Sequence, residues 1–120
     1  MLSVTITIDD NKYLASFPNV GQKIQIEINK QRYSSGQYGS MLLTGTQDAV
    51  DALDLIDAIS TFEVVCPDFI KDFKPGISFS SLPLNSGKQI VDQYTNIYRP
   101  FYKKIIDQLK ESGNGSKNAD

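Results

Sequence analysis

The sequence lacks histidine and tryptophan altogether, and it has a single cysteine among its 120 residues. Without histidine, the Ser-His-Asp and Cys-His catalytic arrangements and histidine-ligated metal sites are excluded. The lone Cys66 excludes an intramolecular disulfide, and its place after Val64 and Val65 predicts a buried, inert thiol. Neither a Walker A loop nor a GxGxxG loop occurs. We therefore predict no catalytic residues, no cofactor and no metal site, and we expect that the protein is not an enzyme.

Long apolar runs and a strong excess of charge are also missing. No run of about 18 apolar residues occurs, which argues against a membrane-spanning helix. The N-terminal segment lacks a basic stretch followed by an apolar run, so we expect no signal peptide. The net charge of −2 argues against a dedicated nucleic-acid-binding protein, because such proteins gain affinity by neutralising phosphates. We therefore expect a cytosolic protein that binds neither membrane nor nucleic acid.

The first seventeen residues have the pattern of a β-hairpin. Apolar and polar residues alternate strictly over residues 2–8, which is typical of a half-buried strand. Asp9, Asp10 and Asn11 tolerate left-handed backbone geometry, so they predict the turn. Residues 12–17 then predict the return strand.

The segment 23–33 is ambiguous between strand and helix. Ile24, Ile26 and Ile28 alternate as in a third strand, whereas Ile24 and Ile28 are also one helical turn apart. We favour an extended entry at 23–25 followed by a short helix over 26–34. Gly36 would then end this helix in the left-handed conformation.

The clearest amphipathic helix lies between Thr44 and Pro67, and we expect it over 46–66. Thr44, which has capping-box spacing to Gln47, and Thr46 are competing N-caps. Pro67 predicts the end of the helix, because proline disfavours helical geometry in the residue before it. The apolar residues recur at steps of three to four and predict one buried face. They are Val50, Leu53, Ile56, Ile59 (or Ala58) and Phe62.

Four aspartates lie along the same helix, three residues apart, from Asp48 to Asp57. Four oxygen-bearing side chains invite a metal-site interpretation. Steps of three drift around a helix, however, so the carboxylates fan out instead of converging on one cation. We therefore predict a solvated acidic face. Its first two aspartates lie near the N-terminus of the helix, where their negative charge interacts favourably with the positive end of the helix dipole.

The remainder of the chain predicts a linker, a second long helix and a tail. Residues 68–84 predict an irregular segment lying along the core surface, with one helical turn at 68–73. A continuous apolar stripe predicts a helix over 86–111, which Pro100 should kink or split near Ile97. Ser86 has capping-box spacing to Gln89 and predicts the start of this helix.

These elements predict an α+β fold. A two- or three-stranded antiparallel sheet from residues 2–28 should pack on the helices at 46–66 and 86–111. One domain would cover 1–111. The polar segment 112–120 would form a disordered tail, because it has almost no apolar side chains to bury.

Aromatic and basic residues interleave in the second helix, and such clusters can stack bases and hold phosphates. Tyrosines beside an apolar stripe are more often the rim of a core or of a protein interface, so we predict protein contact. The segment 21–39 has two interpretations, a connector or an exposed loop and helix that meets a partner. The candidate partner-binding residues are Tyr98, Phe101, Tyr102, Ile105, Lys30 and Tyr38.

Several short motifs resemble a recurring pattern in small proteins encoded among the tail genes of tailed bacteriophages. The resemblance is loose and covers most of the chain. Its residues are Val20-Gly21-Gln22, Ile24, Ile26-Glu27, Lys30, Ser35-Gly36, Tyr38 and Met41, followed by Cys66-Pro67-Asp68 and then Tyr94, Pro100 and Tyr102.

The resemblance implies a tail assembly chaperone, a small non-enzymatic protein of the host cytoplasm. Its partner would be the tail tube or tape measure protein, and a homo-oligomer is a further expectation. A stable structural component of the virion neck or tail is the alternative. A third hypothesis is a small enzyme that uses Asp, Glu or Tyr, which two facing carboxylates such as Glu27 and one helix aspartate would favour.

Overall fold

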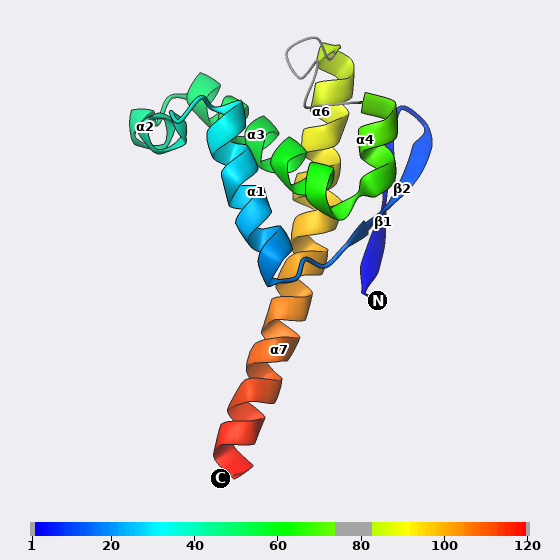
Figure 1. Ribbon diagram of the computed structural model, residues 1–120, viewed down its shortest axis with the longest axis vertical. Coiled ribbons are helices and arrows are strands. Elements are labelled where there is room, and N and C mark those ends of the chain that lie inside the picture. The colour runs from blue at the N-terminus through cyan, green and yellow to red at the C-terminus, as the bar shows by residue number, and fades with distance from the viewer. Residues whose placement is uncertain (1, 74–82, 120) are drawn as a thin grey trace.

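The protein is a two-stranded antiparallel β-hairpin packed on helices, which confirms the predicted α+β class (Figure 1). The structure, a computed structural model, describes residues 2–73 and 83–119. None of the helices within these ranges is long and apolar enough to cross a membrane. The elements in chain order are β1 (Ser3–Ile8), β2 (Asn11–Ser16), α1 (Val20–Tyr33), α2 (Tyr38–Thr44), α3 (Gln47–Val65), α4 (Pro67–Phe73), α6 (Leu84–Gln93), the π-helical turn η2 (Tyr94–Tyr98) and α7 (Arg99–Ala119).

The hairpin forms where the alternating pattern predicts it. Ile8 pairs with Asn11, and the two turn residues Asp9 and Asp10 have φ values of 51° and 66°. Positive φ at both central residues matches the right-handed twist of the flanking strands. The inward-facing Ile6 and Ile8 are completely buried.

Helix α6 covers the outer edge of β1. The backbone N–H of Thr7 donates to Gln93 Oε1 at 2.9 Å, and that of Asp9 donates to Gln89 Oε1 at 2.8 Å. Two side-chain amides thus satisfy edge groups that a third strand would otherwise pair. The predicted capping box of Ser86 and Gln89 is therefore wrong. Ser86 Oγ donates to Asp9 at 2.8 Å, and the helix begins two residues earlier, at Leu84.

The alternative of a third strand at 23–33 is wrong, because this segment lies within α1. Asn19 caps the helix: its side chain accepts from the Gln22 backbone while the Gln22 side chain accepts from the Asn19 backbone. This reciprocal cap satisfies two N-terminal donors and starts the helix six residues before the predicted position. At the other end, Ser35 and Gly36 both adopt positive φ, and the Gly36 N–H donates to the Gln31 carbonyl at 2.8 Å.

Helix α3 follows the prediction closely, with Thr46 as its N-cap and Cys66 at its end. Thr44 instead ends the short helix α2. Between them Gly45 has a φ of 70°, which suits glycine and lets the chain reverse.

The prediction of a fully solvated acidic face on α3 is wrong at one position. Asp57 is only 8% exposed. A tyrosine from α2 and two cations from α1 and α7 surround its carboxylate, and these neighbours are far away in the sequence. Val50, predicted on the buried face, is 41% exposed instead, because it precedes the part of α3 that the core covers.

The predicted linker contains α4, and residues 74–82 lie outside the described ranges. Pro67 both ends α3 and occupies the first position of α4, where its missing N–H costs no hydrogen bond. The second long helix is interrupted where the sequence predicts. Pro100 cannot donate to the carbonyl four residues earlier and its ring crowds that carbonyl, so the helix widens into η2 just before it.

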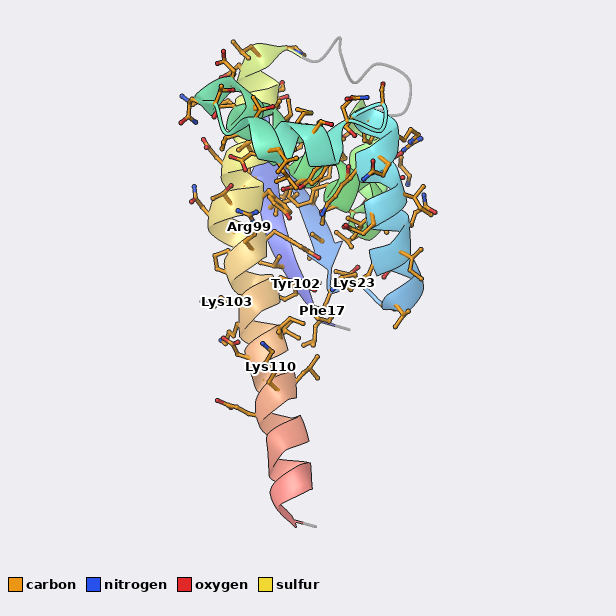
Figure 2. All side chains as sticks on the ribbon, turned by 90° about the vertical axis from the view of Figure 1, so that its left-hand side faces the viewer. Phe17, Lys23, Arg99, Tyr102, Lys103 and Lys110 are labelled. Atoms are coloured by element: carbon orange, nitrogen blue, oxygen red, sulfur yellow. The ribbon has the colours of Figure 1, made fainter. Side chains whose placement is uncertain are left out.

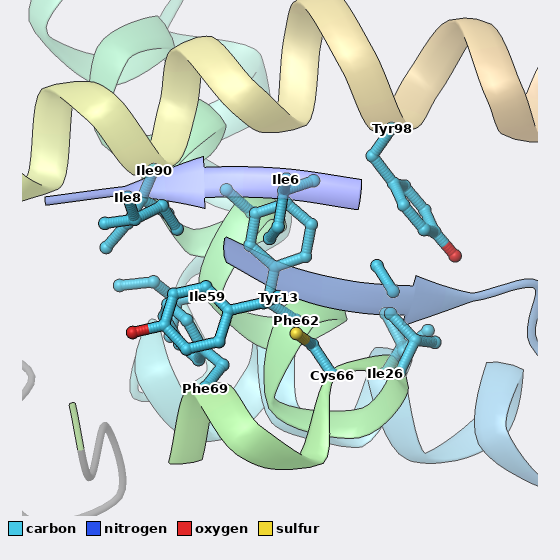
Figure 3. Packing of buried hydrophobic residues seen from close by; sticks show 13 residues of the cluster. Ile6, Ile8, Tyr13, Ile26, Ile59, Phe62, Cys66, Phe69, Ile90 and Tyr98 are labelled. Atoms are coloured by element: carbon cyan, nitrogen blue, oxygen red, sulfur yellow. The ribbon is translucent and has the colours of Figure 1, made fainter. Parts of the chain in front are cut away.

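The core lies where the hairpin, α3, α4 and α6 meet (Figure 3). Phe62 is at its centre and makes edge-to-face contacts with Phe69, Tyr94 and Tyr98 at 5.8–5.9 Å between ring centroids. Helix α7 leaves this body and extends away from it, so the molecule measures 53 Å along its longest axis (Figure 1). The helical backbone includes 112–119, so the disorder of 112–120 stays a prediction.

Candidate functional site

An open cavity of about 260 Å³ lies between α1 on one side and η2 with the start of α7 on the other. Figure 2 shows Lys23, Tyr102 and Phe17 close together between these helices, with Arg99 further along the same side. Three of the candidate partner-binding residues, Lys30, Tyr98 and Tyr102, line this cavity together. The complete lining is Pro18, Lys23, Ile26, Glu27, Lys30, Thr61, Tyr94, Tyr98, Arg99 and Tyr102.

The lining of the cavity carries more positive than negative side chains. Lys23, Lys30 and Arg99 contribute three positive charges, whereas Glu27 contributes one negative charge. Glu27 is already engaged, because its Oε2 lies 2.8 Å from Lys30 Nζ. The cavity therefore has an excess of positive charge in a molecule whose net charge is −2.

Lys23 has a fixed position but no acidic partner among the described residues. Its Nζ donates to the Tyr102 hydroxyl at 2.6 Å and lies 5.4 Å from the centre of that ring. Phe17 stacks on the face of Tyr102 at 5.2 Å between ring centroids, whereas Lys23 contacts the tyrosine at its hydroxyl. Lys23 thus keeps unused donors at the edge of the cavity.

The buried Asp57 stands behind the cavity and joins its two walls. Its Oδ1 lies 3.7 Å from Lys30 Nζ on α1, and its Oδ2 lies 3.9 Å from Arg99 Nη2 on α7. The Tyr38 hydroxyl donates to the same carboxylate at 2.5 Å. Burial lowers the pKa of Lys30, but the hydrogen bond that its ammonium donates to Glu27 and the charge of Asp57 outweigh this effect, so the net shift is upward.

Tyr94, Tyr98 and Tyr102 form the aromatic wall of the cavity. Consecutive rings stack at 6.0 and 6.4 Å between centroids. Tyr98 is only 3% exposed, and burial raises the pKa of its hydroxyl. The guanidinium of Arg99 lies 5.2 Å from the centre of the Tyr94 ring, which holds this cation over the aromatic wall.

A second surface lies directly beside the cavity, on the outer side of α1. Val20, Ile24 and Ile28 are spaced four residues apart and are 78%, 57% and 53% exposed. Four-residue spacing places them in one row along the helix, and we call this row the α1 ridge. Helix α1 uses other residues, Ile26 and Asn29, to contact the body of the protein.

The structure distributes the predicted partner-binding residues between surface and interior. Lys30 and Tyr102 are half-buried in the cavity, and Tyr38 contacts Asp57 behind it. Ile105 and Tyr98 are buried, and Phe101 is half-buried against the core. A role for any of these six in partner binding stays a prediction.

Lys23, Arg99 and the α1 ridge were not predicted from the sequence. The signal for the ridge was present, because Val20, Ile24 and Ile28 have helical spacing. It was hidden by the alternation of the isoleucines, which also fits a strand. The signal for Arg99 was its position in the turn of Tyr98 and Tyr102, although only the fold reveals that this turn faces α1.

Two further features bear on chemistry. Cys66 is fully buried, and burial raises the pKa of its thiol to about 11, as expected for an inert cysteine. Within the described ranges, no group of three or more His, Cys, Asp and Glu side chains is arranged to hold a metal ion.

A shallow groove of about 510 Å³ also runs between α3 and α6, where Leu84 is 91% exposed.

Comparison with known proteins finds no match: no family model, no curated protein and no solved structure is similar to this chain.

Proposed function

We propose that this protein is a non-enzymatic assembly factor of a bacteriophage tail, and that it acts like a chaperone in the host cytoplasm. Its partner would be a tail protein, with the tail tube and tape measure proteins as the candidates. The sequence resemblance supports the phage context. The single observation that supports protein binding is the exposed α1 ridge.

An exposed row of three β-branched apolar side chains is costly to leave in water. Covering Val20, Ile24 and Ile28 with a partner would contribute on the order of 2–4 kcal/mol, given their present exposure. Helix α1 is already capped and packed against α3 without them. The ridge is therefore surplus to folding, and exposed apolar patches of this kind mark interaction sites.

The arrangement of acids favours this proposal over a small enzyme. Glu27 and Asp57 do approach one another, because both contact Lys30. The ammonium group stands between the two carboxylates, however, and Asp57 also accepts from Tyr38. A structural role, in which the two carboxylates hold Lys30 between them, therefore accounts for their approach.

The test is capture of named tail proteins by the purified full chain. The tail tube and tape measure proteins of the same phage would be identified by mass spectrometry after a pull-down. The double change Ile24→Asp with Ile28→Asp should abolish capture, because it places two charges in an apolar contact. The matched control is Leu43→Asp on α2, where the original side chain is 90% exposed. Equal capture by the Ile24 and Ile28 variant would refute the proposal.

Mass spectrometry of purified phage particles distinguishes an assembly factor from a stable structural component of the virion. An assembly factor should be absent from finished virions, because it leaves after the tail is built. A fixed copy number in the particle would instead establish a stable component of the neck or tail.

A further inference from the structure

We propose that the cavity between α1 and α7 receives an acidic side chain of the partner polypeptide, while the partner covers the α1 ridge. This inference rests on the proposed protein-binding function and adds the chemistry of the partner. The partner would carry an Asp or Glu beside an apolar segment.

The charge of the cavity selects an anion. The lining carries three cations and one carboxylate that is already paired with Lys30, and with the buried Asp57 behind it the cavity keeps one net positive charge. Asp57 lies at 3.7 and 3.9 Å from its two cations, which is longer than a close charge-assisted hydrogen bond. Lys23 and Arg99 therefore keep donors that an added carboxylate could accept from.

The walls hold these donors in place before any ligand arrives. Tyr102 fixes Lys23 from α7, while Asp57 and the Tyr94 ring hold Arg99 on the other side. These contacts restrict the two cations, and a restricted side chain loses less conformational entropy on binding than a free one.

The volume of the cavity favours a side chain over a whole ligand. Pockets for small molecules typically occupy about 300–1,000 Å³. This cavity, at about 260 Å³, falls below that range but accommodates one carboxylate-bearing side chain. Nucleic acid is disfavoured, because the chain as a whole is negative and would repel a phosphate backbone.

The position of the cavity couples it to the α1 ridge. Lys23 lies three residues from Val20 and Glu27 three residues from Ile24, so the charged row adjoins the apolar row on one helix. A segment lying along the ridge could therefore place an acidic side chain between α1 and α7 at the same time.

The test uses two probes that are amidated at the α-carboxyl group, N-acetylglutamate α-amide and N-acetylglutamine α-amide. They differ only in that the first has a charged side-chain carboxylate and the second a neutral amide. Each is titrated into the full ¹⁵N-labelled chain at constant ionic strength, and chemical shifts are followed by NMR. We expect the glutamate probe to shift signals of residues 23–30 and 94–102 in a saturable manner. The glutamine probe should bind about tenfold more weakly, because it lacks the charge.

Paired variants establish the site. Lys23→Gln with Arg99→Gln removes two charges but keeps most of each side-chain stem, and it should abolish the shifts. Lys110→Gln is the matched control, since Lys110 is exposed and lies further along α7 than Arg99 (Figure 2). The helical rise between the two residues is about 16 Å. Thermal unfolding of each variant shows that it is folded.

Three results would overturn the inference. They are equal binding of the two probes, equal losses in the Lys110 variant, and tighter binding of inorganic phosphate than of the glutamate probe. The titration needs no tail protein, so its outcome is independent of the pull-down. Binding of the glutamate probe alongside failure of capture would refute the tail partner but support the carboxylate site.

Discussion

The hydroxyl of Tyr98 donates to the backbone carbonyl of Ser16 at 2.9 Å, and this bond joins the π-helical turn to the end of β2. The two residues are 82 positions apart in the chain. Tyr98 also stacks between Tyr94 and Tyr102, so the same residue fixes the aromatic wall of the cavity and closes the hairpin onto it.

Tyr98→Phe tests this connection. The change removes the hydroxyl and keeps the ring, so the carbonyl of Ser16 loses its donor. We expect the free energy of unfolding to fall by about 1 kcal/mol, the usual contribution of one hydrogen bond. Urea denaturation measures this loss. Tyr102→Phe is the control and should change stability little, because its bond to Lys23 is exposed to water; equal losses in both would contradict the prediction.

Asp57→Asn tests the carboxylate that joins the cavity walls. The amide still accepts from Tyr38, but Lys30 and Arg99 lose their shared negative charge. We expect a loss of about 1–2 kcal/mol, less than for a fully buried pair because Arg99 is half-exposed to solvent. Denaturation of this variant beside Asp51→Asn, whose carboxylate is exposed, gives the comparison. Equal stability of the two would show that Asp57 does not hold the walls together.

Cys66 should be unreactive in the folded protein. Its pKa is raised from 9.0 to about 11 by burial, so at pH 8–9 the folded chain holds almost no thiolate. The pKa of the thiol is higher in the folded protein than in the unfolded chain, so the buried neutral thiol does not oppose folding below pH 9. As the pH rises from 9 toward 11, the unfolded chain loses this proton first, and the free energy of unfolding falls. Labelling with a thiol reagent at pH 8.5 should be slow without denaturant and fast in it. Rapid labelling under native conditions would contradict the buried position.

Removal of residues 112–120 should leave the fold unchanged. This segment carries almost no apolar side chains, so its loss removes little buried surface. We expect the melting temperature to stay within about 2 °C of the full chain, which corresponds to well under 1 kcal/mol at this size. Circular dichroism during heating measures it. A markedly lower melting temperature would mean that the segment contacts the body.

Local patterns were sufficient to predict the hairpin and α3. Strict alternation placed β1, and Pro67 marked the end of α3 without any information on tertiary contacts. Helix α1 could have been predicted better, because Asn19 and Gln22 have the spacing of a reciprocal cap. The same spacing predicts a cap at Ser86 and Gln89, whose side chains instead bind Asp9. Sequence spacing alone cannot show that competition.

The cavity was less predictable than the fold, because its parts come from distant segments. Lys30 on α1 and Arg99 on α7 meet through Asp57, whose spacing on α3 resembles that of its three neighbouring aspartates. Only packing distinguishes the buried member from the solvated ones. The four-residue spacing of the tyrosines at 94, 98 and 102 places them on one face of a helix, but it does not show that this face meets α1.

The covering of β1 by Gln89 and Gln93 has a consequence for synthesis on the ribosome. The hairpin is made before these two amides, which lie 80 and 86 residues after the backbone groups that they cover. During that interval β1 presents unpaired backbone groups and could pair with a strand of another nascent chain. Conversion of both glutamines to alanine should therefore lower the yield of soluble protein markedly and lower the melting temperature of the purified protein only slightly. The reason is that β1 is open to pairing with another chain only until the C-terminal helices have folded.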